Sequence, residues 1–302
     1  MRRPAGISAL IVGCAMLVGC GTTGPIIPDM ADHSLPLDRD GPAAPLTTTI
    51  DDSIPDKYRH AIEGAQIEGR LLYLEDRAAW IATDVVKARG ILDQYRATAT
   101  GWLSLQQDTD GLVWRVLFTA GSDENPAAYA EVEVDFTQQP ARTSILPLAA
   151  PRPLGDFEQL LDAARRGFLH KEWLRCAKTY NTSTQFLRDE GRDFVVLRLM
   201  PAWTDVAQRP MGGFHRFRVP LGGNGVVEHF AQTQTCLVDA DTRPGSESTF
   251  VMTLINSPVP TEFDVFESLS YGRPHYVITS AGSWLVDAGR VRWLDKTEEA
   301  KP

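Results

Sequence analysis

The sequence predicts an α+β protein, with an N-terminal helical segment followed by a mostly antiparallel sheet that contains an inserted helix. Apolar residues recur at three- or four-residue spacing over residues 55–89, which indicates one buried face of a helix. Over residues 128–136 the apolar residues alternate with polar ones, which indicates a strand with one buried and one solvated face. An Asn-Gly pair at Asn224 then lies between two strand-like segments and predicts a β-hairpin.

The N-terminal helix has clear sequence signals at both ends. Pro55 suits a first helical position, and Asp56 would lie near the positive end of the helix dipole. Gly90 is a typical residue for ending a helix. Gly64 and Gly69 weaken the interior, so we expect one long helix or two shorter ones.

The remaining elements follow from shorter patterns. An amphipathic helix is predicted over residues 156–170 and another over 263–269. Arg198 interrupts an apolar run that otherwise has the length of a buried strand. The predicted strands are residues 114–119, 128–136, 194–200, 214–219, 226–230, 249–255, 275–279, 283–286 and 290–294.

The N-terminus predicts an envelope lipoprotein. Two arginines follow Met1, and an apolar stretch of small and aliphatic residues, 7–18, leads to Gly19-Cys20, as in a signal peptide. This stretch is shorter than the roughly 20 residues that span a bilayer. The segment Leu17-Val18-Gly19-Cys20 resembles the bacterial lipobox, which implies that the sulfur of Cys20 carries a diacylglyceryl group after cleavage before this residue. The alternative is an ordinary secretory signal that is cut a few residues later.

The predicted organisation follows from that cleavage site. Residues 1–19 form the signal peptide, residues 20–53 hold the lipidated cysteine and a flexible tether, residues 54–295 form a single α+β domain, and residues 296–302 form a disordered tail. Five prolines and a threonine run make the tether unsuited to a folded element. Gly21, in place of an aspartate, resembles the pattern of Gram-negative lipoproteins sent to the outer membrane, so we expect the domain to face the periplasm.

The charge of the chain limits its partners. With 30 basic and 39 acidic residues the net charge is −9, and loss of Arg2 and Arg3 with the signal peptide makes it more negative. An acidic surface disfavours nucleic acid and anionic lipid headgroups. The expected partners are therefore the membrane, through the lipid on Cys20, and an envelope protein whose identity the sequence does not give.

Two cysteines remain in the folded part, Cys176 and Cys236. An even pair in an oxidising compartment predicts a disulfide. Two buried free thiols are the alternative, because sequence alone does not show whether the side chains meet.

Common catalytic motifs are absent from the sequence, including Gly-x-Ser-x-Gly, the Walker loop, His-Glu-x-x-His and Cys-x-x-Cys. The best candidate site combines His215 and His229, on the two arms of the predicted hairpin, with Asp205 upstream. Two imidazoles and a carboxylate are suited to metal binding or acid/base catalysis. Histidines that pack in the hairpin are the favoured alternative.

Two other groups of residues are weaker candidates for a site. The acidic pair Glu75 and Asp76 suggests a carboxylate site on the first helix, although a solvated helix face is the favoured interpretation. Several aromatic residues near the hairpin are more typical of a core than of a cofactor pocket. These residues are Trp203, Phe214, Phe217 and Phe230.

Three segments resemble uncharacterised secreted or lipid-anchored proteins of proteobacteria. They read DRAAWIATD at residues 76–84, MGGFHRF at 211–217 and SPVPTEFDVF at 257–266. The resemblance implies an envelope location and no particular activity.

A second resemblance covers residues 249–294. The segment Pro258-x-Pro260-Thr261-x-x-Asp264, a short helix and the strands that follow are similar to the back half of JAB/MPN-type zinc isopeptidases. The resemblance implies that Asp264 matches the zinc-binding aspartate of that family and that Thr261 replaces its serine. The preceding strand, residues 252–256, reads MTLIN and lacks the His-x-His pair, so the resemblance implies a related fold without catalytic zinc.

Taken together, these observations predict a membrane-anchored envelope lipoprotein that serves as a binding or assembly module. We expect no cofactor and no catalytic activity. The alternative is a periplasmic hydrolase that uses His215, His229 and Asp205, either with a bound metal or by acid/base catalysis.

Overall fold

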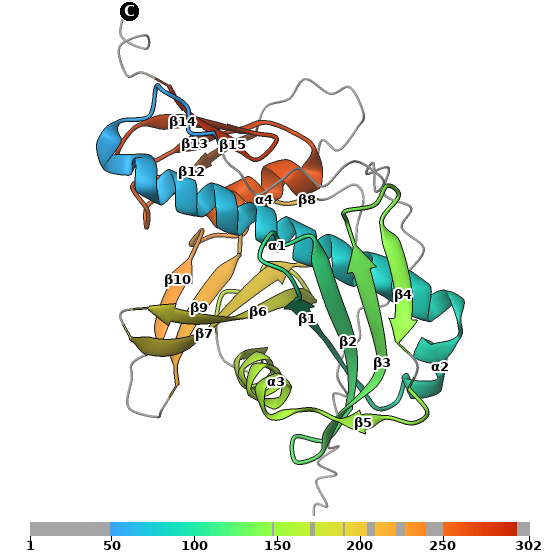
Figure 1. The fold of residues 1–302 in the computed structure, drawn as a ribbon. Coiled ribbons are helices and arrows are strands. Elements are labelled where there is room, and N and C mark those ends of the chain that lie inside the picture. Colours follow the sequence, from blue (N-terminus) through green and yellow to red (C-terminus); the bar gives the residue numbers. More distant parts are fainter. Residues whose placement is uncertain are drawn as a thin grey trace, which may run out of the picture.

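The computed structural model describes residues 49–146, 148–169, 173–189, 191–203, 209–221, 227–239 and 250–294. It confirms the predicted α+β class, with an N-terminal helix, mostly antiparallel sheets and an inserted helix. The long helix α1 runs diagonally through the molecule, and the sheets are arranged around it (Figure 1).

Helix α1 (Asp56–Ala88) is continuous, so of the two alternatives left open by Gly64 and Gly69 the single long helix is the one present. Pro55 is its N-cap residue, and Gly90, with φ of 67°, lies in the left-handed conformation that ends α1 and begins the short helix α2 (Ile91–Tyr95). Among the described residues, none of the helices is both long and apolar enough to cross a membrane.

The first sheet packs on the C-terminal half of α1 (Figure 1). Its strands follow the order β1-β2-β3-β4, all antiparallel, and β5 pairs with β3. The core between helix and sheet includes Ala78 and Ala82 of α1 and Trp114 and Val132 of the sheet. The strands are β1 (Ala99–Gln106), β2 (Val113–Gly121), β3 (Pro126–Asp135), β4 (Arg142–Leu146) and β5 (Arg152–Pro153).

The expectation that one face of β3 is solvated was wrong for Glu131, because this residue is only 4 % exposed. Arg152 forms an ion pair with Glu131 and another, at 2.7 Å, with Glu158 of α3 (Asp156–Leu169). Arg115 pairs with Glu158 at 3.1 Å. The alternation correctly indicated a strand, but α3 and this ion-pair cluster cover the polar face because buried charges need partners.

The second sheet has the order β10-β9-β7-β6 and is antiparallel throughout its described part. Helix α3 packs between it and the first sheet, with Leu161 buried against Leu117 and Val195. The predicted hairpin is present as β9 and β10, while its turn, residues 222–225, lies outside the described residues. The strands are β6 (Tyr180–Asp189), β7 (Arg192–Pro201), β9 (His215–Pro220) and β10 (Glu228–Ala231).

The third sheet packs on the N-terminal half of α1 and on α4 (Glu262–Tyr271) (Figure 1). Its order is β12-β13-β14-β15, with β12 and β13 parallel and the other pairs antiparallel. Helix α4 makes the connection between the two parallel strands. The strands are β12 (Phe250–Thr253), β13 (His275–Ile278), β14 (Ser283–Asp287) and β15 (Arg290–Leu294), and a separate pair joins β8 (Arg209–Pro210) to β11 (Val238–Asp239).

Arg198, which interrupts the apolar run of β7, joins three elements by ion pairs. Its guanidinium is buried and contacts Glu68 of α1 at 2.5 Å and Glu262 of α4 at 3.4 Å. Arg216 of β9 pairs with the same Glu262 at 2.7 Å. Arg198 therefore lies in a buried strand, and acidic residues of two helices compensate its charge.

Helices α1 and α4 approach so closely at Gly69 that a side chain does not fit there. A Cβ atom on Gly69 would lie 2.5 Å from Cβ of Val265 and 2.7 Å from the backbone oxygen of Glu262. Gly64, one and a half turns earlier, has open space around the same position. Gly69 is therefore required by helix packing rather than by helix conformation.

We predict opposite effects of alanine at these two glycines. Gly64→Ala should raise the free energy of unfolding by about 0.5–1 kcal/mol, because alanine costs less conformational entropy in a helix. Gly69→Ala should lower it by about 1–3 kcal/mol, because the methyl group overpacks the contact with α4. Urea unfolding followed by circular dichroism measures both, and equal stabilities of the two variants would contradict the close contact.

Candidate functional site

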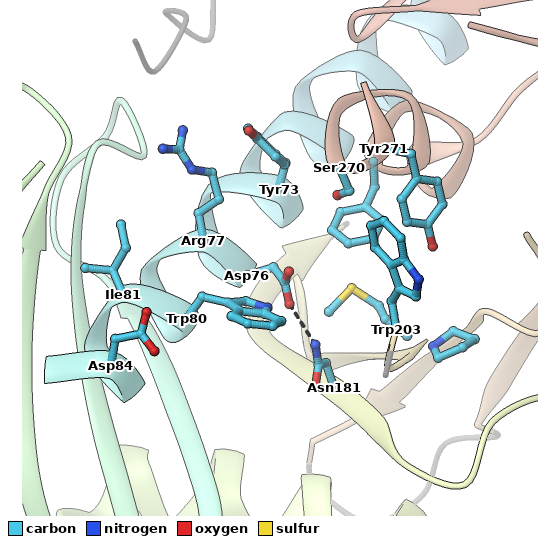
Figure 2. A pocket seen from close by; sticks show the side chains of 13 residues that line it. Tyr73, Asp76, Arg77, Trp80, Ile81, Asp84, Asn181, Trp203, Ser270 and Tyr271 are labelled. Atoms are coloured by element: carbon cyan, nitrogen blue, oxygen red, sulfur yellow. Dashed lines mark hydrogen bonds between the residues drawn. The ribbon is translucent and has the colours of Figure 1, made fainter. Parts of the chain in front are cut away.

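A pocket lies where α1, α4 and the ends of β6 and β7 meet (Figure 2). It encloses about 830 Å³ of space, including part that is open to solvent. Aromatic rings and aliphatic groups form most of the lining, and a few polar groups interrupt it. The lining residues are Tyr73, Asp76, Arg77, Trp80, Ile81, Asp84, Asn181, Met200, Pro201, Trp203, Phe266, Ser270 and Tyr271.

Helix α1 supplies one stripe of this lining. Tyr73, Asp76, Trp80 and Asp84 follow one another at spacings of three or four residues, so they lie on one face of the helix. Figure 2 shows the carboxylate of Asp76 beside the indole of Trp80 and directed toward the centre of the pocket, whereas Arg77 points away from it. The Arg77 guanidinium lies over the rings of Tyr73 and Phe136, at 5.5 and 5.3 Å from their centres.

Asp76 is the polar group at the centre of the pocket. Nδ2 of Asn181 donates a hydrogen bond of 3.0 Å to Oδ1 of Asp76, and within the described part of the chain Asp76 forms no ion pair. Burial raises the pKa of Asp76 to about 6, although the hydrogen bond from Asn181 opposes this shift. The site therefore holds a carboxylate that is partly desolvated and that forms no ion pair with a cationic side chain among the described residues.

Glu75 lies on the neighbouring face of α1 and is buried under β6. The side chain is 2 % exposed, and Oγ of Ser183 donates a hydrogen bond of 2.6 Å to its Oε2. Burial raises the pKa of Glu75 to about 8, so this carboxyl is mostly protonated at neutral pH. Glu75 supports the wall of the pocket but does not line it.

The interpretation of Glu75 and Asp76 as a solvated helix face was therefore wrong. Strand β6, which the sequence analysis did not predict, covers this face, with Asn181 and Ser183 opposite the two acids. The residues of β6 are mostly polar, so the sequence lacks the apolar alternation that indicates a strand. Asn181 and Ser183 are two residues apart, which places them on the same face of a strand.

Trp203 and Tyr271 form the opposite wall, so the expectation that Trp203 is a core residue was also wrong. Their rings meet edge to face, with centres 5.4 Å apart. The guanidinium of Arg209 lies 5.1 Å from the ring centre of Trp203 and 4.8 Å from that of Tyr271. The hydroxyl of Tyr271 donates a hydrogen bond of 2.7 Å to the backbone oxygen of Pro210, and these contacts fix both rings.

The other aromatic residues named from the sequence occupy the interior as expected. Phe214 is fully buried against Phe263 and Phe266, and Phe217 is 5 % exposed. Phe230 packs at the edge of the same cluster.

His215 and His229 do lie together, and they are hydrogen-bonded to each other. Nδ1 of His215 is 2.9 Å from Nε2 of His229, and Nε2 of His215 is 2.8 Å from the backbone oxygen of Leu174. Burial lowers the pKa of His215 to about 4 and also lowers the pKa of His229. The rings stack on Phe217, 4.4 Å from His229, as packing residues do.

This geometry gives no support to the metal-dependent hydrolase alternative. Both ring nitrogens of His215 have hydrogen-bond partners in the protein, so the two imidazoles do not converge on a shared ligand position. Asp205, the third residue of that candidate site, lies outside the described residues, as does the lipidation candidate Cys20.

The structure joins Cys176 and Cys236 in a disulfide, with Cα atoms 5.1 Å apart. The bond links the segment before β6 to the segment after β10. Gly213, with φ of 83°, lies against it, and a Cβ at this position would be 2.5 Å from Sγ of Cys176. The disulfide therefore sits beside the end of the sheet that carries the histidine pair.

No protein-family model, curated protein or solved structure matches this chain. The chemistry of the pocket residues is thus the guide to function. That pocket combines aromatic walls with the carboxylate of Asp76, which forms no ion pair within the described part of the chain, and this arrangement is suited to binding.

We predict that ionisation of Glu75 lowers the stability of the folded protein as pH rises. The folded-state pKa of about 8 lies above the usual value of 4.5, so the folded state retains a proton that the unfolded state loses, and stability falls as pH rises between these two values. Glu75→Gln imitates the protonated acid and should raise stability at pH 8 by about 1 kcal/mol or more, with little effect at pH 5.

Thermal unfolding at several pH values measures this difference. Glu63→Gln is the matched control, because Glu63 is an exposed residue of the same helix. A Glu75→Gln variant that loses stability equally at pH 5 and pH 8 would show that Glu75 is ionised in the folded protein.

Proposed function

We propose that the protein is a lipid-anchored binding module of the bacterial envelope, whose pocket takes a small molecule with an apolar body and a protonated amino group. The observation that supports this most directly is the carboxylate of Asp76. It is partly buried between aromatic walls, and one neutral amide is its hydrogen-bond partner. An ammonium group would supply the missing positive charge.

The walls of the pocket suit the same ligand. Indole and phenol rings attract cations through their faces, by about 0.5–2 kcal/mol. Trp80 lies beside Asp76, and Trp203 and Tyr271 face it across the pocket (Figure 2). Met200 and Phe266 add apolar surface for the body of the ligand.

The proposed location rests on the N-terminal sequence. Cys20 would carry the lipid, and the proline-rich tether would hold the folded domain at a distance from the membrane. Gly21 favours the outer membrane over the inner one. The acidic charge of the chain attracts cationic solutes and disfavours nucleic acid.

We predict that 2-phenylethylamine binds to the full chain, whereas the uncharged analogue 2-phenylethanol binds at least about 10-fold more weakly, corresponding to loss of one ion pair. Asp76→Asn should reduce the difference between the two compounds to less than about 2-fold. Affinity for the amine should rise between pH 5 and pH 7, because the pKa of Asp76 is about 6 and only the ionised carboxylate pairs with ammonium. Isothermal titration calorimetry measures all three effects.

Glu63→Gln provides the control for loss of one surface charge, since Glu63 is exposed and outside the pocket. Equal affinity for the amine and the alcohol in the unaltered protein would argue against a cationic ligand. Binding that is unchanged by Asp76→Asn would place the site elsewhere.

We also predict that Cys20→Ser releases the protein from membranes. Without the sulfur there is no attachment point for the lipid, so the protein should leave the detergent-extractable membrane fraction. Fractionation of cells, followed by detection of the chain in each fraction, checks this. A Cys14→Ser variant is the control, and membrane retention of Cys20→Ser would contradict a lipid anchor at this residue.

A further inference from the structure

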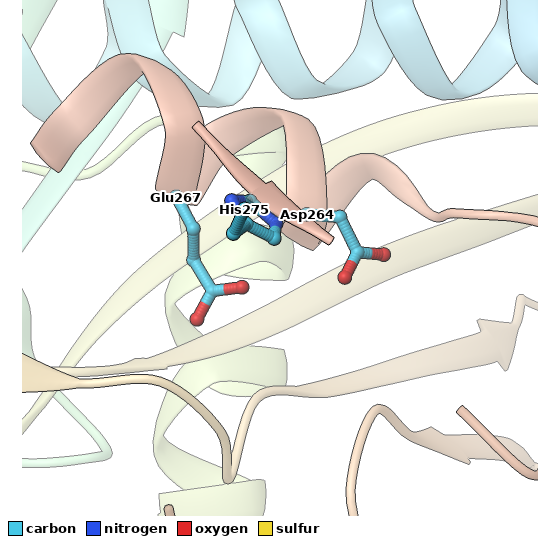
Figure 3. Close-up of side chains that lie close together, drawn as sticks. All are labelled: Asp264, Glu267 and His275. Carbon is cyan, nitrogen blue, oxygen red and sulfur yellow. The ribbon is translucent and has the colours of Figure 1, made fainter. Parts of the chain in front are cut away.

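A second cluster of polar side chains lies outside the pocket, between α4 and β13. Asp264 and Glu267 are one turn apart on α4, and His275 is the first residue of β13 (Figure 3). Their side chains are 0, 0 and 2 % exposed. One ligand-type atom from each residue lies within 4.8 Å of the other two.

Two atoms of these side chains have no hydrogen-bond partner among the described residues. They are Oε1 of Glu267 and Nε2 of His275, and both are buried. Buried polar atoms are almost always paired, because an unpaired one costs about 1–3 kcal/mol. Here two such atoms, from different elements, occur in the same cluster, which points to a missing shared partner.

The imidazole of His275 has an unpaired ring nitrogen. Nε2 is buried and has no hydrogen-bond partner among the described residues. A neutral imidazole nitrogen of this kind is a common metal ligand. Burial lowers the pKa of His275 to about 4, so the ring is neutral, as a metal ligand must be.

The two carboxylates are also fixed by their neighbours. Asp264 forms a capping box with Thr261, whose backbone N–H and Oγ1 donate to Oδ2 at 2.6 and 2.9 Å. Nε2 of Gln232 donates to Oδ1 of Asp264 at 3.3 Å and to Oε2 of Glu267 at 3.0 Å. Oε1 of Gln232 is buried without a partner, and a half-turn of the amide would direct this oxygen toward the carboxylates as a further ligand.

The two buried carboxyl groups also favour a bound cation. Burial raises the pKa of Asp264 to about 6 and that of Glu267 well above its usual value, and the nearby carboxyl of Asp264 adds to the shift of Glu267. A divalent cation between them would compensate both negative charges in the low dielectric of the interior. It would also supply the missing partner of Glu267 and His275.

We propose that Asp264, Glu267 and His275 form a structural binding site for a divalent transition metal of the zinc class. One imidazole with carboxylate oxygens suits zinc and its neighbours, whereas calcium and magnesium prefer oxygen ligands alone. The metal would tie α4 to β13 and enter during folding, because the site is buried. This proposal does not depend on the pocket or on Cys20.

The test uses the full chain in detergent, without a metal-binding tag, unfolded with a chelator to remove metals and then refolded with or without zinc. With zinc added, elemental mass spectrometry should find one zinc per chain. The melting temperature of the protein should also rise. His275→Ala and Glu267→Gln should each weaken zinc binding by more than about 100-fold, the upper end of what loss of a supporting residue costs. Cobalt in place of zinc should give a visible absorption band that both variants lose.

Glu267→Gln keeps the shape of the side chain, so it tests the site even if His275→Ala fails to fold. His60→Ala is the control, because His60 is an exposed histidine of α1 outside the cluster. Folded protein that binds no zinc and shows no shift in melting temperature would overturn the proposal. Zinc that is retained by folded Glu267→Gln with unchanged affinity would overturn it as well.

Discussion

The close contact between α1 and α4 at Gly69 is the constraint on which the rest of the structure depends. Because Gly69 lacks a side chain, Val265 and the backbone of Glu262 reach the surface of α1. This contact places Glu262 where it pairs with Arg198, and so joins both helices to the second sheet. The contact also holds Phe266 and Tyr271 of α4 opposite the Asp76 face of α1, which creates the pocket.

Helix α1 is contacted by other parts of the protein on several faces, and this explains why both apolar and acidic residues of the helix are buried. Apolar side chains near its C-terminal end pack on the first sheet, and those near its N-terminal end pack on the third. Between them lie the buried acid Glu75 and the pocket acid Asp76. A helix that is contacted on several sides has no wide solvated face, so acidic residues on it are not evidence of exposure.

Buried ionisable groups on α1 and α4 are stabilised in different ways. Glu262 is paired with two arginines, which holds its pKa below the usual range against the effect of burial. Glu75 is neutral and hydrogen-bonded to Ser183. Glu267 and His275 retain unpaired atoms, so among the described clusters theirs is the one in which a bound ion would complete the hydrogen-bonding and charge balance.

The sequence by itself determined the class of the fold, the long first helix, the hairpin and the C-terminal strands, because these elements depend on local periodicity and turn residues. It did not reveal β1 or β6. In β6 the polar residues Asn181 and Ser183 face the acids of α1, and the sequence alone does not show that the two elements are in contact. The lipid anchor at Cys20 remains a prediction from sequence. Only the tertiary structure decided that Asp76 enters a pocket and that Asp264, Glu267 and His275 meet, because burial and distance between residues far apart in the chain are set by packing.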